Sequence, residues 1–222
     1  MYDLSRWDAK FQKLAEVYRA LGAAVEYRRA EPASAAEVAA LEEKLGRQLP
    51  PSLKEFLAAF SKNLLFDVKY PEDHYPDKFY PMGGYLEISP AIIVRDENER
   101  QEWVRVCFPN PDDPYHRIWH DKTGFIMAPT GDFIALDLTD AKEDKRVVYL
   151  SHDGDDDING HVLAPGFGEF MERYINIGQF LPEAWELRAH IPEEGNGYLD
   201  PECEAAKEFR RSIGLDWRLL YI

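Results

Sequence analysis

The sequence predicts an α+β fold in which helices pack against a largely antiparallel sheet. Two short helical patterns lie between residues 34 and 60 and share a Leu-Pro elbow. From residue 64 onward, short runs of β-branched and aromatic residues alternate with turn residues. Helices that are followed by a series of strands are typical of the α+β class. The 222 residues, 45% of them hydrophobic and 13% aromatic, suit one large globular domain.

The N-terminal residues predict a helix and a short strand. Gly22 is expected to end the helix, and residues 25–29 are compatible with a strand. The apolar residues of the helix recur at spacings of three and four: Leu4, Trp7, Phe11, Leu14, Tyr18 and Leu21.

The pair of short helices follows. Ser34 and Glu37 match a capping box, in which each side chain satisfies a backbone N–H of the other. Gly46 is expected to end the first helix. The prolines of the elbow are expected to begin the second helix, because the first turn of a helix tolerates a missing N–H. Ser52 and Glu55 are expected to cap this second helix. The apolar stripes are Val38, Leu41 and Leu45, and then Leu53, Phe56, Leu57 and Phe60.

Strand patterns dominate the middle of the chain. Residues 64–70 and 85–88 are strand-like and flank a segment rich in Pro, Tyr and Gly that predicts a loop. A helix is expected to begin at Ser89-Pro90 and to run through the charged residues up to 102. Residues 103–108 then predict a strand, followed by an Asn-Pro-Asp-Asp-Pro turn. Further short strands are expected at 118–119 and 125–127.

Residues 131–175 predict the central unit of strand, strand, acidic loop and helix. Ile134, Leu136 and Leu138 share one face at a spacing of two, and the opposite face is only partly apolar. The β-branched and aromatic run at 147–150 is expected to pair with this strand as an antiparallel hairpin. The helix presents one apolar face, formed by Phe167, Phe170, Met171, Tyr174 and Ile175.

After Gly178 the chain is expected to leave the main sheet, to form a last helix near residues 203–214 and to end in an apolar segment. The simplest organisation is a lead-in with the N-terminal helix at 1–32, a central domain at 33–177, and a C-terminal helical extension at 178–222 packed on that same domain.

Net charge indicates which kinds of partner to expect, and cysteine content and hydropathy indicate the cellular location. A formal net charge of −15 disfavours nucleic acid and anionic membrane surfaces as partners and favours a basic protein. Cys107 and Cys203 form no disulfide framework. The sequence shows no apolar signal core and no stretch long enough to span a membrane, so a cytoplasmic location is expected.

Two patterns contain residues of metal-ligand type. Asp155-x-Asp157-x-Asn159-Gly160 matches the start of a calcium loop, but Gly166 stands where that loop needs an acid. An acidic solvated turn is the favoured interpretation. Zinc would need three or four convergent ligands, whereas the candidates Cys107, His116 and His120 lie among strand and turn signals. We therefore expect no metal and no cofactor.

Catalytic motifs have little support. Ser151-His152-Asp153 is contiguous, whereas a nucleophilic triad is a spatial arrangement. Gly166-Phe167-Gly168 lacks the third glycine and the strand-turn context of a dinucleotide loop. We therefore expect a protein without enzymatic activity.

Acidic residues interleaved with aromatic ones form the strongest candidate for a binding surface. Exposed aromatic anchors ringed by charge are typical of protein–protein contacts. The alternative is that the tyrosines pack beneath their loop and the acids only solvate it. The candidate partner-binding residues are Tyr70, Tyr75, Tyr80, Asp153, Asp155, Asp156 and Asp157.

Several weak motifs in the expected order resemble the SUKH superfamily over roughly residues 33–175. The elbow matches Leu-Gly-x-x-Leu-Pro at Leu45, Gly46, Leu49 and Pro50. The Gly-Asp strand start is matched by Gly131 and Asp132, with Ala135 and Asp137 within the strand; Ala164 and Phe167 match before the last helix of the core.

This resemblance implies an α+β domain with a mixed, largely antiparallel sheet that acts as a binding module. Members include bacterial immunity proteins of toxin systems and a fungal regulator of cell-wall synthesis. We therefore expect a cytoplasmic immunity protein that neutralises a cognate toxin by direct binding. The expected toxin is basic and often a nuclease, and neither nucleic acid nor membrane is a partner. The alternative is a regulatory scaffold in cell-wall synthesis or signalling.

Overall fold

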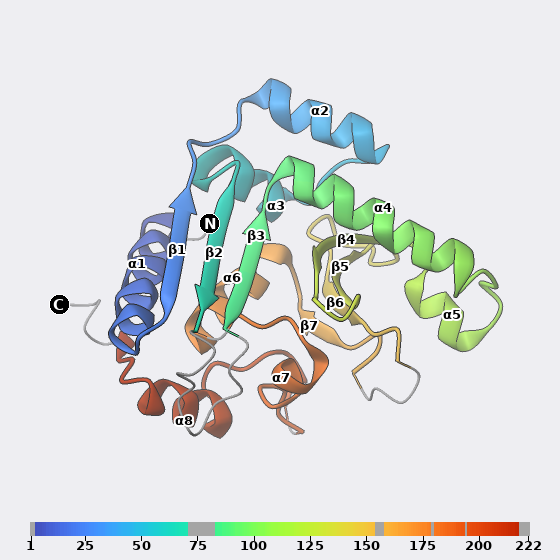
Figure 1. The fold of residues 1–222 in the computed structure, drawn as a ribbon. Coiled ribbons are helices and arrows are strands. Elements are labelled where there is room, and N and C mark those ends of the chain that lie inside the picture. Colours follow the sequence, from blue (N-terminus) through green and yellow to red (C-terminus); the bar gives the residue numbers. More distant parts are fainter. Residues whose placement is uncertain (1–2, 71–82, 154–157, 179, 194, 218–222) are drawn as a thin grey trace.

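The computed structural model describes residues 3–70, 83–153, 158–178, 180–193 and 195–217. It confirms the α+β class: helices pack against two sheets, with strand orders β1-β2-β3 and β4-β5-β6-β7 (Figure 1). Every strand pair in the described residues is antiparallel, in two sheets, where the family resemblance implied one mixed sheet.

In the described part of the chain, the first sheet packs on the core through one of its faces. It contains β1 (Ala24–Arg29), β2 (Leu64–Lys69) and β3 (Gly84–Ile88), and α1 (Leu4–Ala20) packs on its inner face. Phe66 of β2 meets Phe11 of α1 at a ring-centroid distance of 5.5 Å. The opposite face, toward the viewer in Figure 1, carries the polar row Glu26, Asp67 and Tyr85 in cross-strand register.

The predicted helical pair is present, with one different cap. α2 (Ala35–Leu45) begins in the Ser34–Glu37 capping box and ends at Gly46, whose φ of 65° is left-handed. α3 (Pro51–Glu55) continues into a π-helical turn at Phe56–Phe60. The predicted Ser52–Glu55 cap is wrong. The Ser52 backbone N–H and hydroxyl both donate to Asp144, at 3.2 and 2.7 Å, which joins the elbow to the hairpin turn.

The second sheet buries both of its faces. It contains β4 (Lys122–Met127), β5 (Phe133–Asp137), β6 (Val147–Leu150) and β7 (Val162–Ala164). The predicted hairpin is confirmed by the β5–β6 pairing, whereas β7 was not predicted. One face joins the main core under α6 (Phe167–Ile177), and the other forms a second apolar cluster. The residues of that cluster are Phe108, Trp119, Phe133, Ala135, Val148 and Leu150.

Two helices replace predicted strands beside this second cluster. α4 (Pro90–Val106) starts at Ser89 as predicted, but it continues through the residues expected to form a strand at 103–106. α5 (Pro114–Trp119) likewise replaces the strand predicted at 118–119, because Asp113 caps it. Trp103, Val104 and Ile118 pack on the second cluster from these helices. Tertiary packing therefore overrides the local strand preference of Trp, Val and Ile.

The C-terminal segment packs against the same main core as α1. It contains α7 (Ala184–Arg188) and α8 (Glu204–Ser212). Phe180, Leu187 and Leu215 all belong to the core cluster that includes Phe11. In the described part of the chain, no helix combines the length and apolar character that crossing a membrane requires.

His190, buried beside α8, should make stability fall on acidification. Burial, reinforced by Arg210, lowers its pKa from 6.5 to about 4. Between these two pKa values His190 is protonated in the unfolded chain but neutral in the folded protein. The stability present at pH 7 is therefore lost as the pH falls through this range. We expect the free energy of unfolding to drop by about 2–3 kcal/mol between pH 7 and 4.5 from this residue. Urea unfolding at both pH values should show that drop reduced in His190→Gln; an equal drop in both proteins would contradict this assignment.

Candidate binding surface

Only two of the seven predicted binding residues lie in the described part of the chain. Tyr70 is half-buried against the main core, and burial raises the pKa of its hydroxyl, which fits the alternative in which a tyrosine packs beneath its loop. Asp153 is exposed at the start of the acidic loop. The others lie outside the described residues: Tyr75, Tyr80, Asp155, Asp156 and Asp157.

Asp132 anchors the entrance to the acidic loop. Its buried carboxylate accepts hydrogen bonds from the Tyr149 hydroxyl at 2.7 Å and from the His152 backbone N–H at 2.9 Å. The His152 Nδ1 lies 2.6 Å from the same carboxylate. The Gly-Asp motif therefore fixes the backbone that leads into the loop.

The glycine of this motif is required by its position against α4. Gly131 has a φ of 99°, and a Cβ there would lie 3.3 Å from the Trp103 ring. The His152 ring also contacts Trp103, with 5.1 Å between the two ring centres. The loop entrance and the end of α4 are thus in direct contact.

The far side of the acidic loop is closed by a turn. Asn159 accepts the Ser151 N–H through its side-chain oxygen at 3.0 Å, and Gly160, with φ 79°, donates its N–H to Tyr149 at 2.8 Å. The oxygen that a calcium loop would direct at the ion is used here to hold the loop base. Asp155 and Asp157 of the same pattern lie outside the described residues.

A small apolar hollow lies beside this loop, at the C-terminal end of α4. Its volume is about 230 Å³, and its lining consists of Glu99, Glu102, Trp103, Val106 and Cys107. Val106 is 58% exposed, which is unusual for a branched apolar residue. This hollow was not predicted, because residues 103–108 were expected to form a strand. The spacing of Trp103, Val106 and Cys107 at i, i+3 and i+4 is the signal that a helical interpretation would have used.

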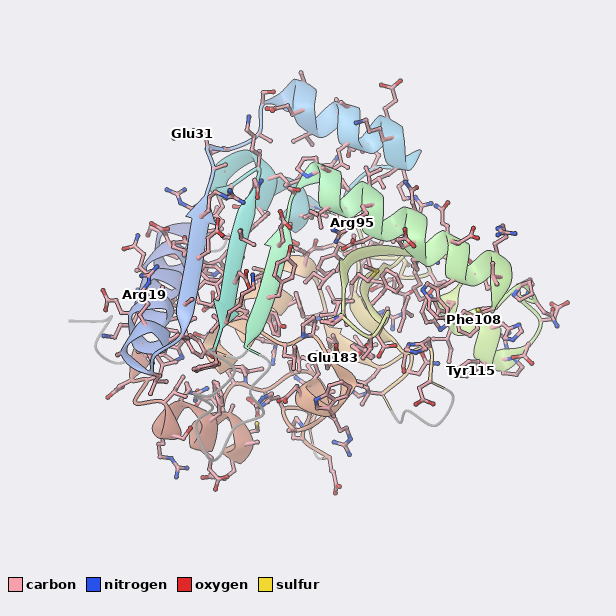
Figure 2. All side chains as sticks on the ribbon, in the orientation of Figure 1. Arg19, Glu31, Arg95, Phe108, Tyr115 and Glu183 are labelled. Carbon is pink, nitrogen blue, oxygen red and sulfur yellow. The ribbon has the colours of Figure 1, made fainter. Side chains whose placement is uncertain are left out.

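An aromatic stack supports the hollow from below. Trp103 lies 6.3 Å from Phe108, and Phe108 stacks on Trp119 at 4.5 Å between ring centres. The Trp119 indole N–H and the Tyr115 hydroxyl both donate to the Ser151 carbonyl at 3.2 Å. Figure 2 labels Phe108 and Tyr115 at this end of the molecule. The hollow and the loop base therefore share one rigid support.

Two carboxylates, those of Glu99 and Glu102, line the hollow. Glu99 and Glu102 are exposed on α4, and Asp153 is exposed at the loop entrance. The hydrogen-bonded Arg105 guanidinium lowers the pKa of the Glu102 carboxyl, so this group is ionised at neutral pH. An apolar centre with an acidic rim complements an apolar side chain presented by a basic surface.

Of the two histidines of metal-ligand type, His116 lies on α5, where strand and turn were predicted, and His120 directly follows the end of this helix. The Asn110 N–H donates to His116 Nδ1 at 3.3 Å, and His120 Nε2 lies 2.8 Å from the Phe108 carbonyl oxygen. Both rings therefore hold the connection between α4 and α5. Within the described ranges, no group of three or more His, Cys, Asp or Glu is placed to hold a metal ion.

Buried charges hold α4 in place over the second sheet. Strand β4 is an edge strand, and carboxylates of α4 accept its outward N–H groups: Glu97 accepts from Gly124 at 2.9 Å, and Asp96 from Met127 at 3.1 Å. Burial raises the pKa of Asp96 even though Arg95 is hydrogen-bonded to it. These contacts complete a sheet edge that would otherwise expose unpaired backbone groups.

The family comparison covers most of this architecture. The profile of the SMI1 / KNR4 family (SUKH-1) matches residues 32–173, which run from the lead-in of α2 into α6. The match includes the elbow, the Gly131-Asp132 anchor and the whole of α4. No curated protein matches the chain with significant similarity. On the strength of the family match, this chain belongs to the SMI1 / KNR4 (SUKH-1) family.

Proposed function

We propose that this protein is a non-catalytic binding module of the immunity type, which neutralises a cognate basic toxin in the cytoplasm by direct contact. Family membership supports an immunity or cell-wall role. The net charge of −15 supports a basic partner, because opposite charge accelerates encounter and favours the correct orientation.

The single observation that carries this proposal is the exposed apolar hollow beside the acidic loop. A partner side chain of the size of Leu or Met fits the hollow at the end of α4. Lys or Arg residues around that side chain would then meet Glu99 and the Asp153 end of the loop. A toxin of the nuclease class presents such basic surfaces where it holds nucleic acid.

Val106→Glu should abolish this contact without unfolding the protein. A charge inside the hollow opposes the insertion of an apolar side chain, so we expect affinity to fall about 100-fold, with a change in unfolding free energy within about 0.5 kcal/mol. Two measurements check this, both with the toxin that is encoded beside the gene. The first is binding to a catalytically inactivated form of the toxin, and the second is rescue of cells from the active toxin. Trp185→Glu is the matched control: Trp185 is 50% exposed but lies on α7, and this variant should bind and protect normally.

Retained protection by Val106→Glu would contradict the assignment of the hollow. Failure of the unaltered protein to bind any neighbouring toxin would contradict the immunity function itself. The family match also supports a regulatory scaffold in cell-wall synthesis or signalling as the second candidate. In that case, co-purification from the native host should recover a cell-envelope or signalling protein, and the gene should have no toxin beside it.

A further inference from the structure

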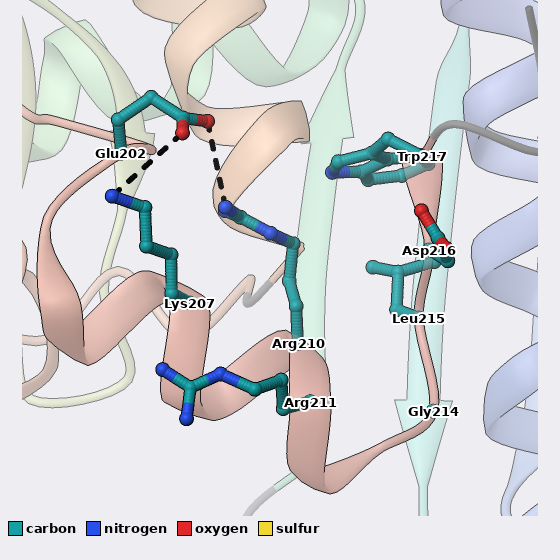
Figure 3. Close-up of a pocket in the computed structure, with 8 residues that line it drawn as sticks. All are labelled: Glu202, Lys207, Arg210, Arg211, Gly214, Leu215, Asp216 and Trp217. Carbon is teal, nitrogen blue, oxygen red and sulfur yellow. Dashed lines mark ion pairs between the residues drawn. The ribbon is translucent and has the colours of Figure 1, made fainter.

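A second depression lies far from the α4 hollow, between α8 and the segment at 214–217 that follows it (Figure 3). Its volume is about 660 Å³, in the range of small-molecule sites. Lys207, Arg210 and Arg211 contribute its charged wall from α8, and Leu215 and Trp217 line the opposite side. Neither the family match nor the proposed function assigns a role to this groove.

The charge of the groove is opposite to that of the chain. Three of its lining residues are basic and two acidic, whereas the whole protein carries 41 acidic and 26 basic residues. Arg210 is only 8% exposed, and burial lowers the pKa of its guanidinium. A buried cation of this kind is stabilised by any anion that approaches it.

Glu202 is the anion that the protein itself supplies, and it is held loosely. Its carboxylate lies 3.5 Å from Arg210 and 3.9 Å from Lys207, beyond the distances of close ion pairs. The Glu202 side chain is 73% exposed. Because Glu202 is exposed and its distances to both cations are long, water and salt screen the pair, and an external anion can displace the carboxylate.

The opposite wall carries the apolar side chains of Leu215 and Trp217 on either side of Asp216, and its tryptophan ring is held in place. The Trp217 indole N–H donates to the Asn176 carbonyl at 2.8 Å, and the same oxygen accepts from Arg210 at 2.9 Å. One carbonyl of α6 therefore sets the spacing between the tryptophan ring and the buried guanidinium. Figure 3 shows Trp217 and Leu215 projecting from the returning segment toward the side of the groove where Arg210 lies.

We propose that this groove binds a small organic anion with a flat, apolar body. The flat body packs against Trp217 and Leu215, and its carboxylate or phosphate replaces Glu202 beside Lys207 and Arg210. Arg211 is exposed, and its ion pair with Glu204 lies at the surface, so it is able to turn toward the same anion. Phosphate and carboxylate share this chemistry, and the choice of probes separates them.

Isothermal titration calorimetry on the full chain tests the proposal with three probes: adenosine monophosphate, indole-3-carboxylate and inorganic phosphate. We expect at least one ring-bearing anion to bind with a dissociation constant of about 0.1–1 mM, and inorganic phosphate to bind at least about tenfold more weakly. Which ring-bearing probe binds more tightly shows which combination of ring and anionic group the groove prefers.

The variants give the proposal its sharpest test. Glu202→Gln removes the competing carboxylate and should tighten binding about threefold, whereas Lys207→Gln combined with Arg211→Gln should weaken it about tenfold. Arg105→Gln, an exposed arginine on α4, is the matched control and should leave binding unchanged. Thermal unfolding of each variant confirms that it is folded.

Three results would overturn the proposal. The first is the absence of heat with both ring-bearing probes, for the unaltered protein and for Glu202→Gln. The second is binding that survives the double substitution, and the third is weaker binding by Glu202→Gln. Because Val106→Glu leaves this groove untouched, loss of toxin binding in that variant and loss of anion binding here are independent outcomes.

Discussion

Arg100→Ala is expected to lower the free energy of unfolding by about 3–5 kcal/mol, because it leaves the buried Glu97 carboxylate without its hydrogen-bonded guanidinium. The Arg47 guanidinium remains 3.9 Å from that carboxylate, but it is partly exposed and makes no close ion pair with it. Arg100 is 5% exposed and Glu97 is 2% exposed. Two parallel hydrogen bonds, of 2.8 and 2.9 Å, join the guanidinium to this carboxylate. A third donor of Arg100 reaches the Trp119 carbonyl at 2.6 Å, so the same side chain ties α4 to α5.

The same helix supplies a matched control. Arg105 pairs with Glu102 at the same i, i+3 spacing, but both side chains are more than half exposed. Arg105→Ala should therefore leave the unfolding free energy almost unchanged. Urea unfolding followed by circular dichroism measures both variants. Equal losses would mean that burial adds nothing to the Arg100–Glu97 pair.

A second substitution separates the unpaired charge from simple loss of packing. Adding Glu97→Gln to Arg100→Ala removes the buried charge while keeping an oxygen that accepts the Gly124 N–H. We expect this double variant to recover about 1–2 kcal/mol relative to Arg100→Ala alone. A double variant that is less stable than Arg100→Ala would show that packing, rather than the charge, determines the cost.

Local signals in the sequence predicted the structure correctly where the residues that determine it lie within one segment. The Ser34–Glu37 box, the Gly46 stop and the apolar face of α6 are all set by residues within a turn or two, and all three are present. The β5–β6 hairpin belongs to the same class, because a short polar turn brings two strand-forming runs together.

Local signals in the sequence did not predict the structure where a residue far away in the chain determines it. Ser52 has the right spacing for a cap with Glu55, yet it donates to Asp144, a residue that only the fold brings close. The charged run at 95–100 gave the right helix, but nothing local indicates that Asp96 and Glu97 are buried against the edge of β4.

The candidate site likewise has one part that local signals predicted and one part that they did not. Asp153 could be placed on an acidic loop from composition alone, and it is exposed. The hollow could not be predicted, because its lining depends on α4 continuing through Trp103 and Val106. That continuation depends on an apolar cluster built from β5, β6 and α5.

Trp119→Ala should be as costly as the loss of Arg100, for a different reason. Trp119 is fully buried, stacks on Phe108 at 4.5 Å and meets the Phe133 ring edge at 5.9 Å. Truncation leaves a cavity in the second cluster, so we expect the free energy of unfolding to fall by about 3–5 kcal/mol. The indole N–H to Ser151 is lost as well, which removes one of the bonds that fix the base of the acidic loop.

Trp185→Ala is the natural comparison, since it deletes the same atoms from a side chain that is 50% exposed. Its cost should stay within about 1 kcal/mol, because little packing is lost at the surface. Trp119→Phe keeps most of the ring volume but removes the N–H donor, and we expect it to cost about 1–2 kcal/mol. Urea unfolding ranks the three variants. If Trp119→Phe were as damaging as Trp119→Ala, the hydrogen bond to Ser151, and not the filled cluster, would be what joins α5 to the acidic loop.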